Sequence, residues 1–482
     1  MKSKYKIIVF FVIASLTLYS CEDNNDSLEV PRAVEVQNFI WKGLNLYYLW
    51  QEISPDLADN RFENQNQLNT FLYTYPDPKI LFDHLKVEPS IDRFSVLVED
   101  YTYLENLFQG VTKNNGMDFT LRFKPGSQTE IYGVVNYIIP NSDAATKNIL
   151  RGMIFSAIDG QALNKDNYSA LIAQNSYTLN FADFDNGNIT PNGQSVNLVK
   201  TQITENPVFL TKIIQNNNQK VGYLMYNSFT ANYDLELNQA FGTFKNEGIT
   251  DLVLDLRYNG GGSVLTATRL ASMITGQFNN QIFAKQQWNS KIQAYFIENS
   301  PSQLVNKFTN SIDNTPLNSL NLSRIYILTT SGTASASELI INGLKPYINV
   351  IQIGTKTIGK NVGSITLYDS PTFNKKDLSP RHKFAMQPIV IKTVNKDGFG
   401  DYQNGIIPTF EQSENPENMG VLGNSNESLL NTALGLINGN AKIIPRDSQQ
   451  FGKEFINSKS AQRFGNEMYI DTNNLIYLPI IK

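Results

Sequence analysis

Residues 251–262 read DLVLDLRYNGGG, an apolar run that ends in three consecutive glycines. A run of about four to eight such residues bounded by glycine is typical of a buried strand. Apolar side chains with helical spacing follow from Ser263 to Ile274, so this stretch predicts a strand that turns directly into a helix. The backbone N–H groups of a glycine turn are unobstructed, which suits binding of an anion or an oxyanion.

Strands and helices alternate on both sides of this segment, over residues 208–440. Alternation of this kind predicts an α/β layer structure. A dinucleotide-binding turn would need glycine where Leu265 stands, so that function is not supported. The predicted strands, besides 251–257, are Lys220–Tyr226, Arg324–Thr329 and Val350–Gly354. The predicted helices, besides 263–274, are Asn232–Asn246, Ser335–Leu344 and Glu427–Ile437.

Two further regions precede this domain, and a polar, mixed tail over 441–482 follows it. Residues 34–110 carry a helical apolar pattern and predict an accessory helical domain. Residues 111–207 consist of short β-like runs with short helices at Ser142–Leu150 and Asn167–Ala173. The order of these elements resembles a PDZ domain, and Gly116, Met117 and Phe119 match the loop that binds peptide carboxylates in that family. Asp118 stands where a glycine is common, and its charge would repel a peptide C-terminus.

The first residues indicate an exported protein. Three lysines precede an apolar run from Ile7 to Leu16, which is typical of a signal peptide over residues 1–20. The segment ending in Cys21 resembles the lipobox of bacterial lipoproteins, which implies a lipid anchor on Cys21 followed by an acidic tether up to residue 33. The resemblance predicts a cell-envelope lipoprotein of the outer membrane, facing either the periplasm or the surface.

Composition narrows the possible chemistry. A formal charge of −4 without a basic tract argues against nucleic acid as a partner. The chain has one cysteine and two histidines, so neither disulfides nor a zinc site nor a Ser-His-Asp triad is supported. We predict no metal and no cofactor.

A second informative segment, 330–338, reads TSGTASASE and leads into the predicted helix at Ser335. A hydroxyl at a helix start lies where free N–H groups and the helix dipole favour negative charge. The alternative is that Ser335 is only an N-cap, with Glu338 completing a capping box.

The loop 355–363 follows the next strand and contains Gly359-Lys360. Residues 354–360 satisfy the spacing of a P-loop, but Asn361 lacks the hydroxyl that holds Mg²⁺, and a strand rather than a helix follows. Nucleotide binding is therefore not expected.

Taken together, the glycine turn, the serine segment and Gly359-Lys360 resemble the core of C-terminal processing (tail-specific) peptidases, related to the tricorn core. The resemblance implies a ClpP/crotonase-like α/β core and a Ser335–Lys360 dyad, since 25 residues separate nucleophile and lysine in that family. It implies supporting roles for Glu338 and Thr357. It also implies an oxyanion hole from the N–H groups of Ala336 and of Gly261 or Gly262.

A lysine can act as a base at neutral pH only if burial lowers its pKa from about 10.4. Ile351, Ile353 and Ile358 could supply an apolar pocket for Lys360. The leading hypothesis is therefore a serine endopeptidase that hydrolyses exported polypeptides. Two alternatives are a catalytically silent, lipid-anchored peptide-binding protein on the same scaffold and a glycan-binding surface lipoprotein.

Overall fold

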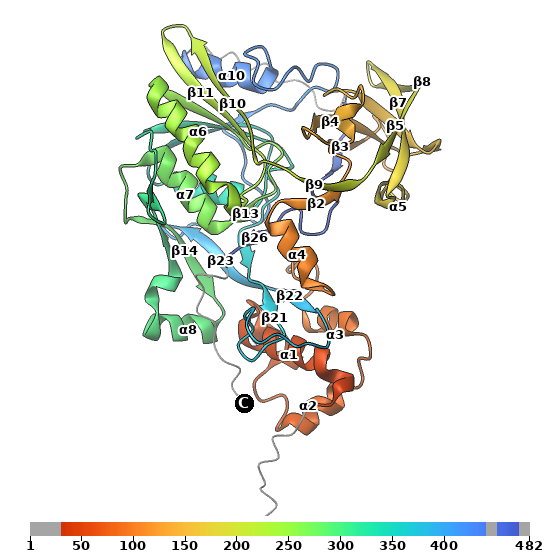
Figure 1. Cartoon of the computed structure of the whole chain (residues 1–482), viewed down its shortest axis with the longest axis vertical. Helices are drawn as coiled ribbons and strands as arrows, with labels where there is room; N and C mark the ends of the chain where they lie inside the picture. Colours follow the sequence, from red (N-terminus) through yellow and green to blue (C-terminus); the bar gives the residue numbers. More distant parts are fainter. Residues whose placement is uncertain (1–29, 440–450, 472–482) are drawn as a thin grey trace, which may run out of the picture.

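The computed structural model describes residues 30–439 and 451–471 (Figure 1). The predicted signal peptide, Cys21 and most of the tether lie outside these residues. Within the described part, no helix combines the length and the apolar character needed to cross a bilayer.

The centre of the molecule is a six-stranded sheet in the order β10-β11-β12-β18-β19-β24. β10 and β11 form an antiparallel hairpin, and the neighbours from β11 to β24 pair in parallel. The bounds are β10 Val208–Asn216, β11 Gln219–Tyr226, β12 Asp251–Asp255, β18 Arg324–Thr329, β19 Asn349–Gly354 and β24 Phe410–Glu411.

Helices cover both faces of this sheet. Side chains of α6, α7 and α9 share one apolar core with alternate residues of β11, β12 and β18, and α10 packs on the residues between them. Since successive residues of a strand point to opposite faces, this arrangement gives three layers. The bounds are α6 Asp234–Glu247, α7 Val264–Thr275, α9 Ala336–Leu344 and α10 Ser428–Ile437. The predicted multi-domain α/β fold is confirmed.

A second six-stranded sheet runs beside the first, in the order β13-β26-β20-β23-β14-β15. Its strand β26 comes from the C-terminal segment and pairs in parallel with β13 and β20. The bounds are β13 Gly262–Ser263, β14 Ile282–Trp288, β15 Val305–Lys307, β20 Val362–Ser364, β23 Ile389–Asn395 and β26 Met468–Tyr469.

Residues 114–199 form a separate β-rich module, whose sheet runs β25-β3-β4-β5-β7-β8 with β6 on β5. The bounds are β3 Met117–Phe123, β4 Ile131–Ile138, β5 Ile154–Ile158, β6 Gln161–Ala162, β7 Ser176–Asp185, β8 Asn188–Val199 and the helix α5 Tyr168–Ala173. The predicted helix Ser142–Leu150 is wrong: only a 3₁₀ turn, Ala144–Thr146, forms there. The ribbon of β2 (Val111–Asn114) and β9 (Thr201–Thr204) connects module and core.

The N-terminal region is helical and packs on the far end of the second sheet (Figure 1). Its core includes Trp288, Ile292 and Phe296 from β14 and α8, and Leu367 and Met386 from a small sheet. Its helices are α1 Glu35–Tyr47, α2 Gln65–Leu72, α3 Pro78–Leu85 and α4 Tyr101–Phe108. Helix α8, Ser290–Asn299, comes from later in the chain and shares the core of α1. The small sheet runs β1 Val96–Val98, β22 Ala385–Gln387 and β21 Leu367–Tyr368.

The described part of the predicted tail is built into the fold. β25 (Glu454–Asn457) adds to the edge strand β3 of the module, antiparallel. β26 follows about ten residues later and lies in the second sheet, with Met468 fully buried in the main core. Residues 451–471 therefore run from the module to the core.

Candidate active site

Ser335 precedes helix α9 with φ 65° and ψ −117°, a positive φ that is costly for a residue with a side chain. Its side chain is 0% exposed. The hydroxyl makes no hydrogen bond to any described residue. The Glu338 carboxylate accepts the Ser335 N–H, so the capping box that the alternative interpretation predicted is formed. A strained backbone and a buried hydroxyl are in addition the features expected of a group held for chemistry.

Glu338 joins the serine to the lysine loop. Its Oε2 accepts the Ser335 N–H at 2.7 Å and the Lys360 N–H at 2.8 Å. Its Oε1 accepts the Gly359 N–H at 2.7 Å and the Thr357 hydroxyl. Burial raises the pKa of Glu338, and these four donors oppose that effect. Glu338 and Thr357 therefore hold the backbone of the lysine loop, whereas the lysine amine is held elsewhere.

The Lys360 amine is 0% exposed and lies on two groups that the sequence did not indicate. Its Nζ is 3.0 Å from Oε2 of Glu467 and 4.4 Å from the ring centre of Phe94. Burial lowers the pKa of Lys360, while the Glu467 carboxylate raises it. Ile351 and Ile353 belong to the core under α10 instead, so the lysine pocket has a different composition from the predicted one.

The glycine turn lies against the start of α9. Gly261 and Gly262 have φ 112° and 136°, which side chains rarely allow. A Cβ on Gly261 would lie 2.5 Å from Cβ of Ser335 and 3.0 Å from N of Ala336. The Gly261 N–H donates to Oδ1 of Asn259 at 2.8 Å, so in this arrangement it is not available to an oxyanion.

The loop predicted to bind peptide carboxylates has its amide groups engaged. The N–H of Gly116 donates to Asn114 and that of Met117 to Asn115. The N–H of Phe119 donates weakly to Oγ of Ser458, at 3.4 Å. Asp118 is buried, and burial raises its pKa to about 6 against the lowering effect of Lys459.

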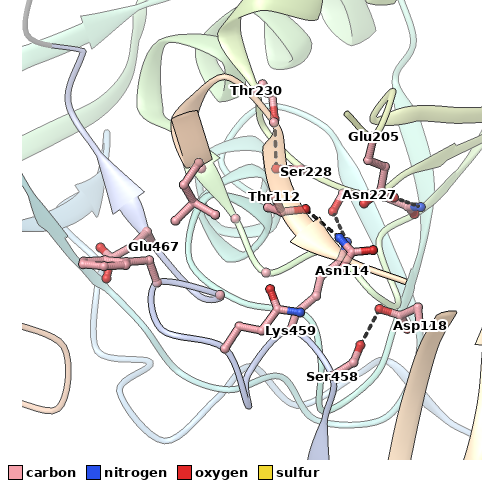
Figure 2. Close-up of a pocket in the computed structure, with 18 of the residues that line it drawn as sticks. Thr112, Asn114, Asp118, Glu205, Asn227, Ser228, Thr230, Ser458, Lys459 and Glu467 are labelled. Atoms are coloured by element: carbon pink, nitrogen blue, oxygen red, sulfur yellow. Dashed lines mark hydrogen bonds between the residues drawn. The ribbon is translucent and has the colours of Figure 1, made fainter. Parts of the chain in front are cut away.

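A pocket opens between the module, the glycine turn and the C-terminal segment (Figure 2). Thr112, Asn114 and Glu205 line its module side, and Gly261, Lys459 and Glu467 line the opposite side. Glu205 accepts hydrogen bonds from Tyr137 and Asn227. The pocket thus leads from the interdomain ribbon to the glycines beside Ser335.

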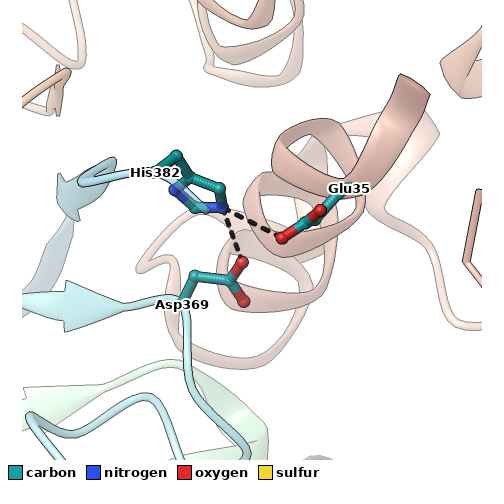
Figure 3. A group of neighbouring side chains, drawn as sticks. All are labelled: Glu35, Asp369 and His382. Carbon is teal, nitrogen blue, oxygen red and sulfur yellow. Dashed lines mark hydrogen bonds and ion pairs between the residues drawn. The ribbon is translucent and has the colours of Figure 1, made fainter. Parts of the chain in front are cut away.

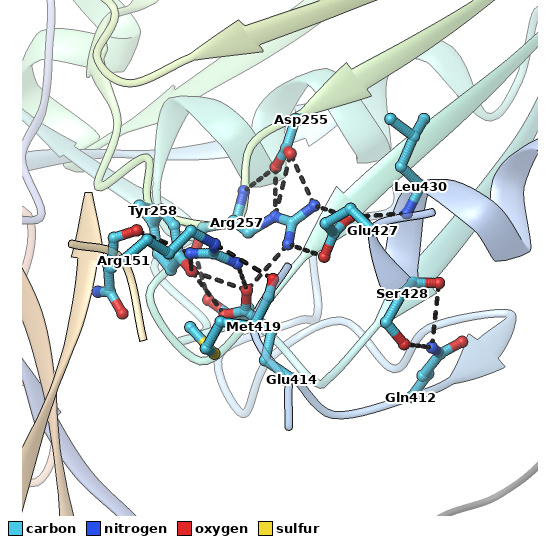
Figure 4. A network of polar contacts seen from close by, with 12 residues as sticks. Arg151, Asp255, Arg257, Tyr258, Gln412, Glu414, Met419, Glu427, Ser428 and Leu430 are labelled. Atoms are coloured by element: carbon cyan, nitrogen blue, oxygen red, sulfur yellow. Dashed lines mark hydrogen bonds and ion pairs between the residues drawn. The ribbon is translucent and has the colours of Figure 1, made fainter. Parts of the chain in front are cut away.

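A buried ionic network surrounds Arg257, which precedes the glycine turn in the chain (Figure 4). Arg257 contacts Asp255 at 2.8 Å, Glu427 at 2.8 Å and Glu414 at 2.9 Å. Arg151 of the module reaches the same Glu414 at 2.6 Å. The network therefore connects the module to the strand end from which the glycine turn starts.

One group of side chains could hold a metal ion, among the described residues. Ligand atoms of Glu35, Asp369 and His382 lie within 4.8 Å of one another (Figure 3). Glu35 is already paired with Arg381 at 2.6 Å and accepts from Ser379 at 2.9 Å. We therefore interpret the group as an ion-pair cluster that connects α1 to the loop 369–383. It contains no residue of the serine–lysine site.

Comparison with known proteins supports the resemblance found in the sequence. Residues 220–371 match the profile of peptidase family S41, and residues 35–96 match that of the peptidase S41 N-terminal domain. The chain is therefore similar to peptidase family S41 over these two regions. Its S41 region contains the glycine turn, Ser335 and Lys360.

Named relatives agree with this assignment. The chain is 29% identical over 181 residues to the chloroplastic C-terminal processing peptidase of Tetradesmus obliquus, covering 36% of this chain and 35% of that one. It is 27% identical over 169 residues to the carboxyl-terminal-processing protease of a Picosynechococcus strain, covering 35% and 36%. The chain thus spans about a third of the length of these curated relatives.

A solved structure matches along most of the chain. The crystal structure of a putative S41 protease from Bacteroides fragilis is 27% identical, with a TM-score of 0.64, and covers 84% of this chain and 98% of that one. The structural similarity to this protein therefore extends beyond the two regions that match family profiles.

Glu467 and Phe94 are the residues of the site that sequence reasoning missed. Glu467 stands in a polar stretch without periodicity, and Phe94 is one of 28 phenylalanines. Neither carried a motif. Only the fold of the C-terminal segment brings Glu467 to Lys360, 107 residues later in the chain.

Proposed function

We propose that this protein is a serine endopeptidase of the C-terminal processing type, which cleaves exported polypeptides with Ser335 as nucleophile and Lys360 as general base. The observation that carries the proposal is that Glu338 binds the backbone N–H groups of both Ser335 and Lys360, whose hydroxyl and amine are each buried from solvent. The S41 family match supports the same reaction class.

In the proposed reaction, neutral Lys360 accepts the Ser335 proton while Oγ bonds to the scissile carbonyl carbon. The resulting lysine ammonium then protonates the leaving amine as the C–N bond breaks. Water, deprotonated by Lys360, hydrolyses the acyl-enzyme and restores the Ser335 hydroxyl. Acid–base work of this kind contributes about 10²–10⁴-fold to the rate.

The oxyanion is assigned to the N–H groups of Ala336 and of Gly261 or Gly262. The N–H of Ala336 begins α9, where the dipole favours negative charge. The Gly261 N–H becomes a donor only if it leaves Asn259. Each donor of this type contributes about 10²–10³-fold.

The β-rich module and the pocket in Figure 2 support polypeptides as substrates. An extended chain can add to an open sheet edge through its backbone, which requires no particular side chains. In this proposal the module is PDZ-like, and Gly116, Met117 and Phe119 lie in its peptide-binding loop.

The proposal is tested by cleavage of an unfolded, dye-labelled protein. We expect wild type to cleave it, with a rate that rises with pH as Lys360 loses its proton. Ser335→Ala and Lys360→Ala should lower the rate by at least about 10²-fold, because the first removes the nucleophile and the second the base. Lys356→Ala is the matched control, since Lys356 is exposed in the same loop. Equal cleavage by all four proteins would refute the dyad.

We further propose that the protein is exported and held at the membrane by a lipid on Cys21, as the lipobox-like sequence suggests. Cys21→Ser should then move the protein from the detergent-rich phase to the aqueous phase in a detergent partition of expressing cells. An unchanged partition would count against the anchor.

A further inference from the structure

The C-terminal segment occupies the edge of the module where a polypeptide would add. β25 pairs antiparallel with β3, with Glu454 opposite Arg122 and Asn457 opposite Thr120. Beyond the strand, the N–H of Ser458 donates to the carbonyl of Phe119 at 2.8 Å. This edge is therefore filled by the chain itself as far as the predicted peptide-binding loop.

Side chains reinforce this docking. Arg122 on β3 donates to the carbonyls of Phe451 and Gly452 and pairs with Glu454 at 2.8 Å. Ser458 donates to Asp118 at 2.6 Å. The docking therefore engages both backbone and side chains of the two segments.

The same segment then runs along the glycine turn. A Cβ on Gly260 would lie 1.9 Å from the carbonyl oxygen of Gly465, and one on Gly261 would lie 2.7 Å from that of Glu467. The same Cβ position on Gly261 would also lie 3.0 Å from the backbone N of Ala336. Backbone carbonyls of the segment thus lie beside the groups assigned to the oxyanion hole.

Glu467 of the same segment contacts Lys360. Its carboxylate pairs with the Lys360 amine at 3.0 Å and accepts from Ser364 at 3.1 Å. The amine makes no hydrogen bond to the Ser335 hydroxyl. A carboxylate at this distance favours the charged lysine, and a charged lysine cannot accept the serine proton.

We propose that residues 451–471 act as an intramolecular ligand that keeps the peptidase latent, by filling the β3 edge and holding Lys360 on Glu467. The proposal rests on the proposed function, because it describes the regulation of the same site. An extended polypeptide that displaces β25 would draw Glu467 away and free the amine to face Ser335.

The test compares Glu467→Gln with wild type in the full chain. The amide keeps the shape of the side chain but removes the carboxylate charge that raises the pKa of Lys360 against the lowering effect of burial. Losing an opposite charge lowers the pKa of a lysine by one unit or more, which gives about tenfold more neutral amine. We expect kcat/KM for the unfolded substrate at pH 7 to rise about tenfold and the rise of activity with pH to begin at lower pH.

Other charges near the lysine remain unchanged in this variant. Asp92 raises the pKa of Lys360 and Arg93 lowers it, and both are retained. Glu52→Gln makes the same chemical change at an exposed position and should leave the pH profile of wild type unaltered. A loss of activity, or no change, in Glu467→Gln would overturn the latent state, because Glu467 would then assist the lysine or be irrelevant to it.

A binding measurement tests the strand edge independently of cleavage. A fluorescent peptide with the sequence 451–471 is titrated into Ser335→Ala and into Ser335→Ala with Glu454→Gln, which loses the Arg122 pair. We expect at least severalfold tighter binding to the double variant, since its own segment is less firmly docked. Equal or weaker binding would contradict the proposal that residues 451–471 block the β3 edge against other polypeptides.

The two proposals fail in different ways. The double variant Glu467→Gln with Ser335→Ala is assayed as well. If neither wild type nor Glu467→Gln shows cleavage that depends on Ser335, the proposed function fails. If wild type shows such cleavage and Glu467→Gln does not exceed it, only the latent state fails.

Discussion

Arg257 carries a fully buried charge close to the glycine turn of the candidate site. It is 0% exposed and shares its guanidinium among Asp255, Glu414 and Glu427. Removing one partner of a buried ion pair costs about 3–5 kcal/mol, because the remaining charge stays desolvated. The position of the glycine turn, which begins three residues after Arg257, therefore depends on the carboxylates of Asp255, Glu414 and Glu427 (Figure 4).

This network predicts a pH dependence of stability. Burial raises the pKa of Glu414, but Arg151 and Arg257 outweigh burial and lower it to about 2. A carboxylate with a depressed pKa stabilises the fold above its unfolded pKa of about 4.3, and that stabilisation is lost as pH falls toward 2. We expect the free energy of unfolding, from urea titrations, to fall between pH 5 and roughly pH 2.

Glu414→Gln provides the control. It should be less stable than wild type at pH 7 and should show a weaker fall with acid, because its side chain no longer titrates. Curves that fall in parallel for both proteins would show that other carboxylates dominate the acid sensitivity.

At the scale of elements, periodicity located the α/β core closely. The strand predicted at Arg324–Thr329 has those bounds, and the helix predicted from Ser335 begins one residue later. These segments are apolar and buried, so local pattern and tertiary environment agree. The helix predicted at Ser142–Leu150 failed: only the 3₁₀ turn Ala144–Thr146 forms, and Ile149 and Leu150 have no regular structure.

The residues of the candidate site likewise fall into those that the sequence could predict and those that it could not. Ser335, Lys360, Glu338 and Thr357 stand in short motifs, and the structure brings them together through hydrogen bonds to one carboxylate. Glu467 could not be predicted, because an ion pair between residues 107 positions apart leaves no local pattern. Its strand β26 has two residues and is defined only by pairing with β13 and β20.

At the scale of the molecule, the site lies where three parts of the chain meet. The core supplies Ser335 and Lys360, the region before the module supplies Phe94, and the C-terminal segment supplies Glu467. The same segment continues onto the edge of the module through β25. One segment of the described chain thus contacts both the module edge and Lys360.

In the proposed reaction, the buried amine of Lys360 activates one serine hydroxyl. The most direct measurement is the rate of labelling by a fluorophosphonate, followed by intact mass and peptide mapping, in wild type and in Lys360→Met. We predict a single adduct on Ser335, formed faster as pH rises, and labelling slower by at least about 10²-fold in Lys360→Met. Equal rates in the two proteins, or an adduct on a different serine, would contradict the account.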